Sequence, residues 1–137
     1  MTQRTIDPTP ADLKRIASDI PLDTPVTMLN LLRFREQAAY PEDSGQPACS
    51  GRAAYARYSE IAIRHVKAVG GEPVVMADVL GRFIGPEDED WDEMLLVRYP
   101  SLSAFLDMVG NADYQAGAVH RTAALADARL IVTRTPD

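Results

Sequence analysis

Residues Val26 to Phe34 form an almost unbroken apolar run with the length of a β-strand. Pro21 and Pro25 interrupt regular secondary structure just before the run begins. Apolar residues occupy both parities of the strand alternation, so side chains on both faces of the strand need cover. Any fold for this chain must therefore place structure on both sides of this strand.

The segment before the run reads as a short helix and a linker. Thr9 can cap a helix whose first position is Pro10 and whose first turn contains Asp12, and this helix is expected to extend to about Ser18. The chain of 137 residues has the length of one ordinary domain. We expect residues 1–25 to form the short helix and linker and residues 26–134 to form one domain.

The remaining elements follow from apolar spacing and from breaker residues. Ser50 can cap a helix with apolar residues at helical spacing, which Gly70 and Gly71 end. A strand is predicted at 74–84, with Gly81 as a possible bulge, and an acidic turn at 86–93 leads to a strand at 94–99. Helical stretches follow from 101 and over 113–125, and a last strand is predicted at 129–134.

Without the first short helix, the order of elements is β-α-β-β-α-β, which is the split pattern of an α+β, ferredoxin-like fold with an antiparallel sheet. Helices cover one face of such a sheet. The runs at 26–34 and 94–99 are apolar at both parities, so the other face also needs a cover. Closed twofold dimers dominate among soluble homo-oligomers, and we predict a homodimer through the open sheet face, forming a dimeric α+β barrel.

Composition excludes several classes of partner and site. The net charge of −6 and the absence of a stripe rich in Lys and Arg disfavour nucleic acid. Cys49 is the single cysteine, so one chain builds neither a disulfide nor a cysteine zinc site, and no cofactor or metal motif is present. The sequence contains no signal-peptide pattern and no apolar stretch of membrane-spanning length. We therefore expect a cytoplasmic protein that does not bind a membrane.

Residues 35–50 contain prolines and a glycine but no apolar period, which indicates a surface loop. The loop is longer than most connections, and this length suggests a lid. Cys49 lies in this loop without an activating neighbour in sequence, and we expect it to be exposed and incidental.

Several ordered motifs occur together: MLNLLRF at 28–34, YARY at 55–58, Gly70-Gly71, WDE at 91–93, VRYPS at 97–101, Tyr114-Gln115 and HRTAAL at 120–125. This set resembles the domain-of-unknown-function family numbered thirteen-thirty, within the dimeric α+β barrel superfamily. The resemblance covers roughly residues 26–133. It implies a ferredoxin-like fold and a dimeric barrel, and it implies no established activity. Relatives in the wider superfamily include cofactor-independent monooxygenases, isomerases and haem proteins, but fold alone does not carry over their chemistry.

Three polar residues are candidates for catalysis. Asn30 lies in an apolar strand, where its amide must find hydrogen bonds, either as a clamp on the backbone or with a ligand. His65 shares the apolar stripe of its helix with Tyr58, so it is expected to face the sheet, as a proton carrier or as a core histidine. Arg98 could fix a carboxylate or an enolate, or form an ion pair with local acids.

Four further residues are candidates for ligand binding: Tyr58, Arg33, Trp91 and Arg121. Tyr58 could orient an aromatic ligand or pack in the core. Arg33 resembles Arg98 in its place near a strand end, and Trp91 needs a packing partner among its acidic neighbours. Arg121 could line a pocket or an interface.

Two functions from different classes remain open. A non-catalytic dimer could bind a small organic molecule, or a cofactor-independent enzyme of monooxygenase or isomerase type could act on a small aromatic or carboxylate metabolite. In the enzyme, Asn30 and Arg98 would stabilise negative charge and His65 would move a proton, which requires the three side chains to share one cavity.

Overall fold

In the computed structural model, residues 2–136 are described, and they form a four-stranded antiparallel sheet with helices on one face. The elements are α1 (Pro10–Asp19), β1 (Val26–Phe34), α2 (Gly51–Ala68), β2 (Glu72–Asp78), β3 (Glu93–Tyr99), α3 (Leu102–Val109), α4 (Ala112–Ala124) and β4 (Leu125–Thr133). The strand order is β2-β3-β1-β4. This arrangement confirms the predicted α+β, ferredoxin-like βαββαβ fold.

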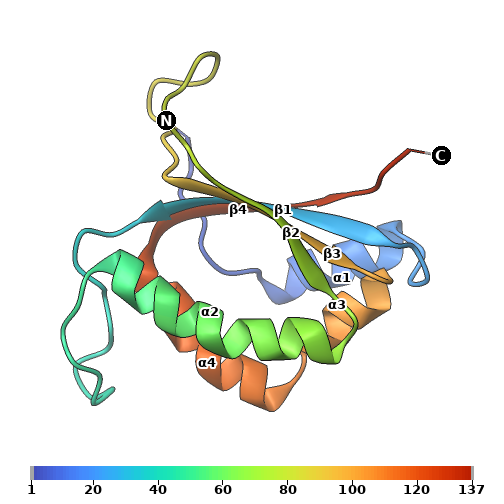
Figure 1. Cartoon of the computed structure of the whole chain (residues 1–137), viewed down its shortest axis with the longest axis horizontal. Helices are drawn as coiled ribbons and strands as arrows, with labels where there is room; N and C mark the ends of the chain where they lie inside the picture. The colour runs from blue at the N-terminus through green and yellow to red at the C-terminus, as the bar shows by residue number, and fades with distance from the viewer. Residues whose placement is uncertain (1, 137) are drawn as a thin grey trace.

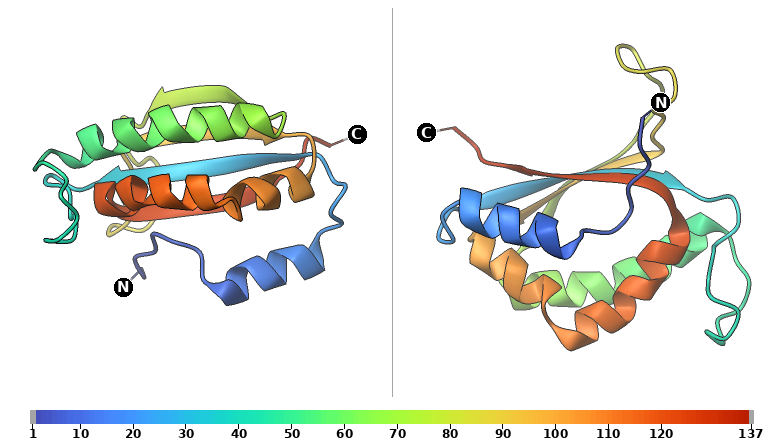
Figure 2. Two further views of the ribbon diagram at one scale, coloured as in Figure 1. Left: turned by 90° about the horizontal axis from the view of Figure 1, so that it is seen from below. Right: turned by 180° about the vertical axis from the view of Figure 1, so that it is seen from behind.

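All four helices lie on the same side of the sheet, and no helix covers the opposite face, which we call the open face (Figure 1). Helices α2 and α4 run side by side beneath the strands, and α1 lies beside this pair (Figure 2). No helix among residues 2–136 has the length and apolar character needed to cross a bilayer.

Local sequence sets the helix ends. Thr9 accepts a hydrogen bond from the Asp12 amide while the Asp12 carboxylate accepts one from the Thr9 amide, which is a complete capping box. Ser50 and Ser101 cap α2 and α3 through their hydroxyl groups. After α2, Gly70 has a φ of +84°, a conformation that glycine adopts without a steric penalty.

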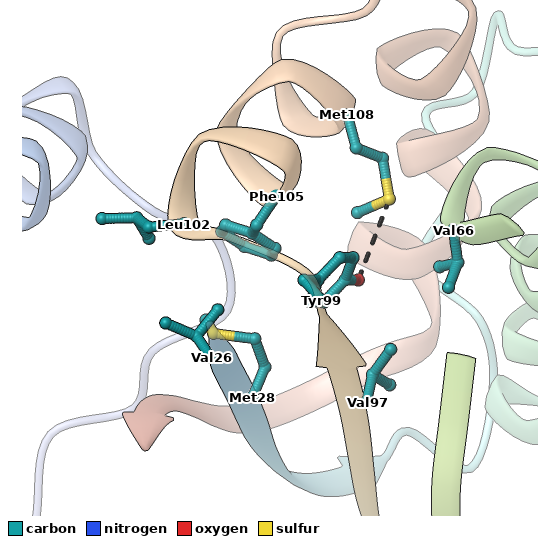
Figure 3. Packing of buried hydrophobic residues seen from close by; sticks show 8 residues of the cluster. All are labelled: Val26, Met28, Val66, Val97, Tyr99, Leu102, Phe105 and Met108. Atoms are coloured by element: carbon teal, nitrogen blue, oxygen red, sulfur yellow. Dashed lines mark hydrogen bonds between the residues drawn. The ribbon is translucent and has the colours of Figure 1, made fainter. Parts of the chain in front are cut away.

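The register fixes which side chains face the helices. In β1, Val26 and Met28 belong to a core cluster with residues of α2 and α3, so the even-numbered residues face the helical layer (Figure 3). The odd-numbered residues, such as Leu29 and Leu31, therefore face the open side, together with their partners Leu96 and Met94 in β3.

The core consists of two separate clusters. The first, at the α3 end of the sheet, contains Val26, Met28, Val66, Val97, Tyr99, Leu102, Phe105 and Met108 (Figure 3). The second, at the opposite end of β1, contains Leu32, Ala54, Tyr55, Ala124, Leu125 and Ala128. The helical side of the sheet is thus sealed at both ends by different residues.

Two predicted strand boundaries were wrong. The strand predicted at 74–84 is β2, which ends at Asp78, because residues 79–84 leave the sheet plane and continue into the turn before β3. The predicted bulge at Gly81 is absent from the described strand pairing, and the register shift lies instead between Pro73 and Val75. The last strand begins at Leu125 rather than at 129.

The 35–50 loop is fastened to the domain. The amide of Ala38 donates to the Cys49 carbonyl at 2.9 Å, and the amide of Ala39 donates to the Ala123 carbonyl at 2.8 Å. Cys49 is half-buried against the second core cluster, so the expected exposure of this cysteine was wrong. Tyr40 of the loop also packs against the second core cluster, so the loop adds apolar contacts to the core.

Candidate functional site

A strip across the helix-facing side of the sheet stays accessible between the two core clusters. Asn30 pairs with Leu95 of β3 and Leu130 of β4, and Leu95 pairs with Met76 of β2, so these four side chains share one face; we call them the Asn30 row. Leu130 is 42% exposed and Met76 is 70% exposed, while Asn30 and Leu95 are half-buried.

The neighbouring rows are closed. Met28 and Val97 pair on one side of the strip, and Leu32 and Ala128 pair on the other, and all four are buried. Contact with the helices therefore seals the sheet before and after the Asn30 row but not along it. This pattern leaves a mostly apolar and partly accessible strip.

Asn30 provides a free polar atom in this strip. Its Nδ2 donates weakly to the carbonyls of Met28 at 3.4 Å and Leu95 at 3.3 Å. Among residues 2–136, no group donates to Oδ1, and no buried side-chain polar atom lacks a hydrogen-bond partner. The Oδ1 atom is therefore an accessible acceptor.

Two tyrosines, one from α2 and one from α4, connect the two core clusters on the helical side of the sheet. The hydroxyl oxygens of Tyr58 and Tyr114 lie 2.6 Å apart, with Tyr58 packed against the second cluster and Tyr114 against the first. Tyr55 stacks on Tyr58 with ring centroids 5.2 Å apart. Burial, with the neighbouring Tyr114, raises the pKa of Tyr58, and burial raises the pKa of Tyr55 to about 12. At physiological pH Tyr55 and Tyr58 are therefore neutral phenols and do not act as bases.

An acidic group lies on the same face of β3. Glu93 pairs with Leu32 and lies two residues from Leu95, so its side chain faces the helices about 7 Å along the strand from Leu95. Burial raises the pKa of Glu93, and the positive charge of Arg52 partly offsets this effect. The second-cluster end of the strip is therefore polar and disfavours a further negative charge.

The three residues predicted to act together do not share one face of the sheet. Arg98 pairs with Thr27, so it lies on the open face, opposite to Asn30. There it forms an ion pair with Glu72 at 2.9 Å, and both side chains are more than half exposed. The ion-pair interpretation of Arg98 fits this position, and the joint site with Asn30 does not.

His65 does not face the sheet as expected. Its ring packs edge-on against Tyr114 with centroids 6.0 Å apart, and it lines a shallow groove between α2 and α4 with Ile61, Arg64, Ala68, Asp113 and Ala116. The helix turns this position outward because α2 packs against α4 along its flank, where Gly117 lies against Ile61.

The other candidate residues have structural neighbours. Arg121 is 11% exposed and donates to the Ile6 carbonyl at 2.6 Å, so it fastens the N-terminal segment. Trp91 lies 4.9 Å beneath the guanidinium of Arg129 on the open side of the sheet. Arg33 also belongs to the open side, in register with Asp127. Of the predicted site residues, only Asn30 and Tyr58 belong to the helix-facing layer around the strip.

Two polar networks escaped the sequence reasoning. Asp127 is fully buried and accepts hydrogen bonds from Arg4 at 3.1 Å, Arg129 at 2.6 Å and the Thr5 amide at 3.0 Å. The isolated acid among the alanines at 126 and 128 was the available signal. Tyr40, His120 and Arg57 form the second network, which joins residues distant in sequence and gives no local signal.

Within residues 2–136, no cluster of three or more His, Cys, Asp or Glu side chains could hold a metal ion. The residues around the strip are amide, phenol, carboxyl and aliphatic groups, which suit an organic molecule.

Comparison with known proteins shows the family. Two crystal structures of RPA0582, a protein of unknown function from Rhodopseudomonas palustris, superpose on this chain with TM-scores of 0.89, for the methylated protein, and 0.88. Sequence identity is 33%, over 99% of this chain and 98% of the relative in the first case. This chain belongs to the RPA0582 family. The near-complete coverage of both chains means that the whole fold is shared.

A more distant structure has the same fold. A dimeric protein of unknown function with a ferredoxin-like fold from Bacteroides fragilis NCTC 9343 is 9% identical, with a TM-score of 0.53 over 81% of this chain and 96% of that protein. No family model matches the chain, and no curated protein matches it.

Proposed function

We propose that this protein is a cytoplasmic homodimer, related to the thirteen-thirty family, that binds a small organic molecule at the Asn30 row. The observation that carries the proposal is the free Oδ1 acceptor of Asn30 in an accessible, otherwise apolar strip. A polar group in such a place is normally satisfied, and a ligand that donates a hydrogen bond would satisfy it.

The chemistry of the strip indicates the kind of ligand. Leu95 and Leu130 provide apolar contact, and the hydroxyl groups of Tyr58 and Tyr114 lie in the helical layer. Glu93 and the net charge of −6 disfavour anions. An uncharged aromatic molecule with an O–H or N–H group therefore fits better than a carboxylate.

The alternative of an enzyme that uses Asn30, Arg98 and His65 together finds no support in the geometry. Proton transfer needs hydrogen-bond distances between the groups, whereas Asn30 and Arg98 lie on opposite faces of the sheet. The proposal is therefore one of binding.

The open face of the sheet exposes apolar side chains, and a second copy of the chain would cover them. Leu29, Leu31 and Leu96 face this side, and Ile131 is 47% exposed there. A contiguous apolar face of this kind marks an interface. The Bacteroides fragilis protein, which has the same fold, is dimeric.

A thermal-shift screen tests the binding site. The panel contains phenols, anilines, aromatic carboxylates and haem, and is applied to the wild-type protein, Asn30→Leu, and the controls Arg98→Ala and His65→Ala. A ligand at 100 times its Kd stabilises the folded state by about 2.7 kcal/mol, or several degrees. We expect phenols or anilines to shift the wild type and both controls, but not Asn30→Leu.

Two outcomes would contradict the binding proposal. One is an absence of any shift in the wild-type protein across the panel. The other is an equal shift in Asn30→Leu, which would place the ligand elsewhere.

A further inference from the structure

The turn between β2 and β3 forms an arm with an apolar tip. Residues 79–92, which we call the arm, rise from the sheet on the side away from α2 and α4 (Figure 1). Three large apolar side chains of the arm have almost no cover: Leu80, near its base, is 97% exposed, and Phe83 and Ile84, which we call its tip, are 100% and 91% exposed. Single exposed apolar residues are ordinary, but three on one projecting turn indicate a contact surface.

The arm is held in this extended position by contacts at its base. Within the arm, the Val79 amide donates to the Asp92 carbonyl at 2.9 Å, and Arg82 forms an ion pair with Asp90 at 2.8 Å. Arg129 of β4 forms an ion pair with Glu89 at 3.2 Å and packs over Trp91. Thr2 donates two hydrogen bonds to the Asp88 carboxylate at 2.6 and 2.7 Å. These contacts join the arm to β4 and to the N-terminal segment. They use the polar residues of the arm and leave its apolar tip without a partner.

We propose that the apolar tip of the arm packs against a second copy of this chain. The arm projects on the same side as the open apolar face of the sheet, so a molecule that covers this face must also pass beside the arm (Figure 1). A twofold partner brings its own arm, and each arm then flanks the other protomer. This inference rests on the proposed homodimer and adds to it a second contact that the sheets do not provide.

The edges of the sheet indicate where the tip binds. Residues near the N-terminus already pair with β4, where the Ala128 amide donates to the Thr5 carbonyl at 2.6 Å. Strand β2 is the other edge, where Val74 and Val75 are exposed, and Val75 pairs with Leu96 on the open face. The partner's β2 edge therefore offers both apolar side chains and an unoccupied strand edge to the tip.

Charge argues against a lipid surface as the occupant. Four consecutive acids, Glu87 to Asp90, lie directly behind the tip, and the chain carries a net charge of −6. An anionic membrane would repel this region, whereas insertion of apolar loops at such membranes is normally assisted by basic residues.

Sedimentation equilibrium on the full chain tests the proposal, with a tip variant, Phe83→Ser/Ile84→Ser, and a control, Leu22→Ser. The tip side chains have almost no contacts in their own protomer, so the variant should fold like the wild type. Leu22 is also exposed but lies before β1, far in sequence from the arm. We expect the dimer Kd to rise by at least roughly tenfold in the tip variant and to stay unchanged in the control.

A photo-crosslinking residue at position 83 provides a second measurement, and it should yield a covalent dimer labelled within residues 72–78. An unchanged Kd in the tip variant would overturn the arm contact while leaving the homodimer in place. A monomeric wild-type protein would overturn both. Binding of wild-type protein to phosphatidylglycerol vesicles that is lost in the tip variant, with no change in Kd, would assign the tip to a lipid surface and overturn the proposal.

Discussion

Asn30 lies at the middle of β1. The neighbouring residues on the same face, Met28 and Leu32, are buried apolar side chains, whereas Asn30 is polar. Its two hydrogen bonds at 3.3 and 3.4 Å are long, so they contribute little to stability. An amide there lowers apolar contact without forming a strong clamp. A residue that the fold does not need for stability, in an accessible strip, is typical of a binding position.

A pair of substitutions on β1 separates these roles. Asn30→Leu should leave the free energy of unfolding unchanged or raise it by up to about 1 kcal/mol, because leucine adds apolar contact and the lost hydrogen bonds are weak. The reverse change two residues away, Leu32→Asn, should lower it by about 3 kcal/mol, because Leu32 is fully buried. Urea unfolding measures both. A loss above roughly 2 kcal/mol in Asn30→Leu would identify Asn30 as a structural clamp.

At the scale of elements, a buried carboxylate holds the N-terminal segment beside β4. Asp127 binds Arg4, Arg129 and the Thr5 amide. Burial by itself would raise the pKa of Asp127, but the hydrogen bonds from Thr5, Arg129 and Arg4 outweigh this effect and lower it. The charged carboxylate is therefore the form that the fold stabilises.

The Asp127 network predicts a pH dependence. A lowered pKa in the folded state gives stability that is complete above the ordinary aspartate pKa of about 3.9 and is lost as the pH falls through the folded value. Asp127→Asn should reduce the free energy of unfolding by about 2 kcal/mol at pH 7, with a shrinking difference from the wild type between roughly pH 5 and pH 2. Urea unfolding at several pH values measures this. A difference that is constant with pH would contradict the charge-based explanation.

A second polar network holds the 35–50 loop to α2 and α4. The Tyr40 hydroxyl and His120 Nδ1 lie 2.6 Å apart, and Arg57 donates to the Tyr40 oxygen at 3.3 Å. Burial and the charge of Arg57 lower the pKa of His120, so the imidazole stays neutral near pH 7 and its Nδ1 accepts a hydrogen bond from the Tyr40 hydroxyl. The loop predicted as a lid is thus fastened at neutral pH.

This fastening should weaken in acid. Because the His120 pKa is lowered in the folded state, the contribution is complete above about pH 6.5, the ordinary histidine value, and is lost as the pH falls through the folded value. We expect protection of the Ala39 amide from hydrogen exchange, corrected for intrinsic rates, to drop about fivefold between pH 7.5 and 5. Tyr40→Phe should show the lower protection at both pH values. Protection that is independent of pH in the wild type would rule out His120 as the titrating group.

The sequence predicts the strands and helices more readily than it predicts how the strands pair and which face each side chain occupies. The apolar run at 26–34 gave β1 with its observed bounds, since a buried strand is read from composition alone. The apolar residues at 79–84 also resemble a strand, but they form the exposed arm. Asn30 and Arg98 were grouped because both occur in apolar strands, whereas the pairing of Arg98 with Thr27 separates them onto opposite faces. Register depends on contacts between distant segments, and one sequence does not contain it.

At the scale of the whole molecule, the sheet divides two tasks between its faces. The helix-facing side contains both core clusters and the Asn30 row between them. The open side contains apolar strand residues, the Trp91 and Arg129 contact and the arm. A ligand and a partner subunit would thus bind to opposite faces of the same four strands, and a change on one face can be made without altering the other.

Two adjacent residues of β4 test this division. Ile131 is 47% exposed on the open face, and Leu130 is 42% exposed in the Asn30 row on the helix-facing side. Ile131→Gln should weaken the dimer by at least roughly tenfold, because it places an amide in the sheet interface, and it should abolish any rise in Tm with protein concentration. Leu130→Gln, which makes the same chemical change at similar exposure, should leave the dimer intact and weaken ligand-induced thermal shifts. Sedimentation equilibrium and thermal unfolding at two protein concentrations separate the outcomes. If both variants dissociate equally, or neither does, the open face of the sheet is not the interface.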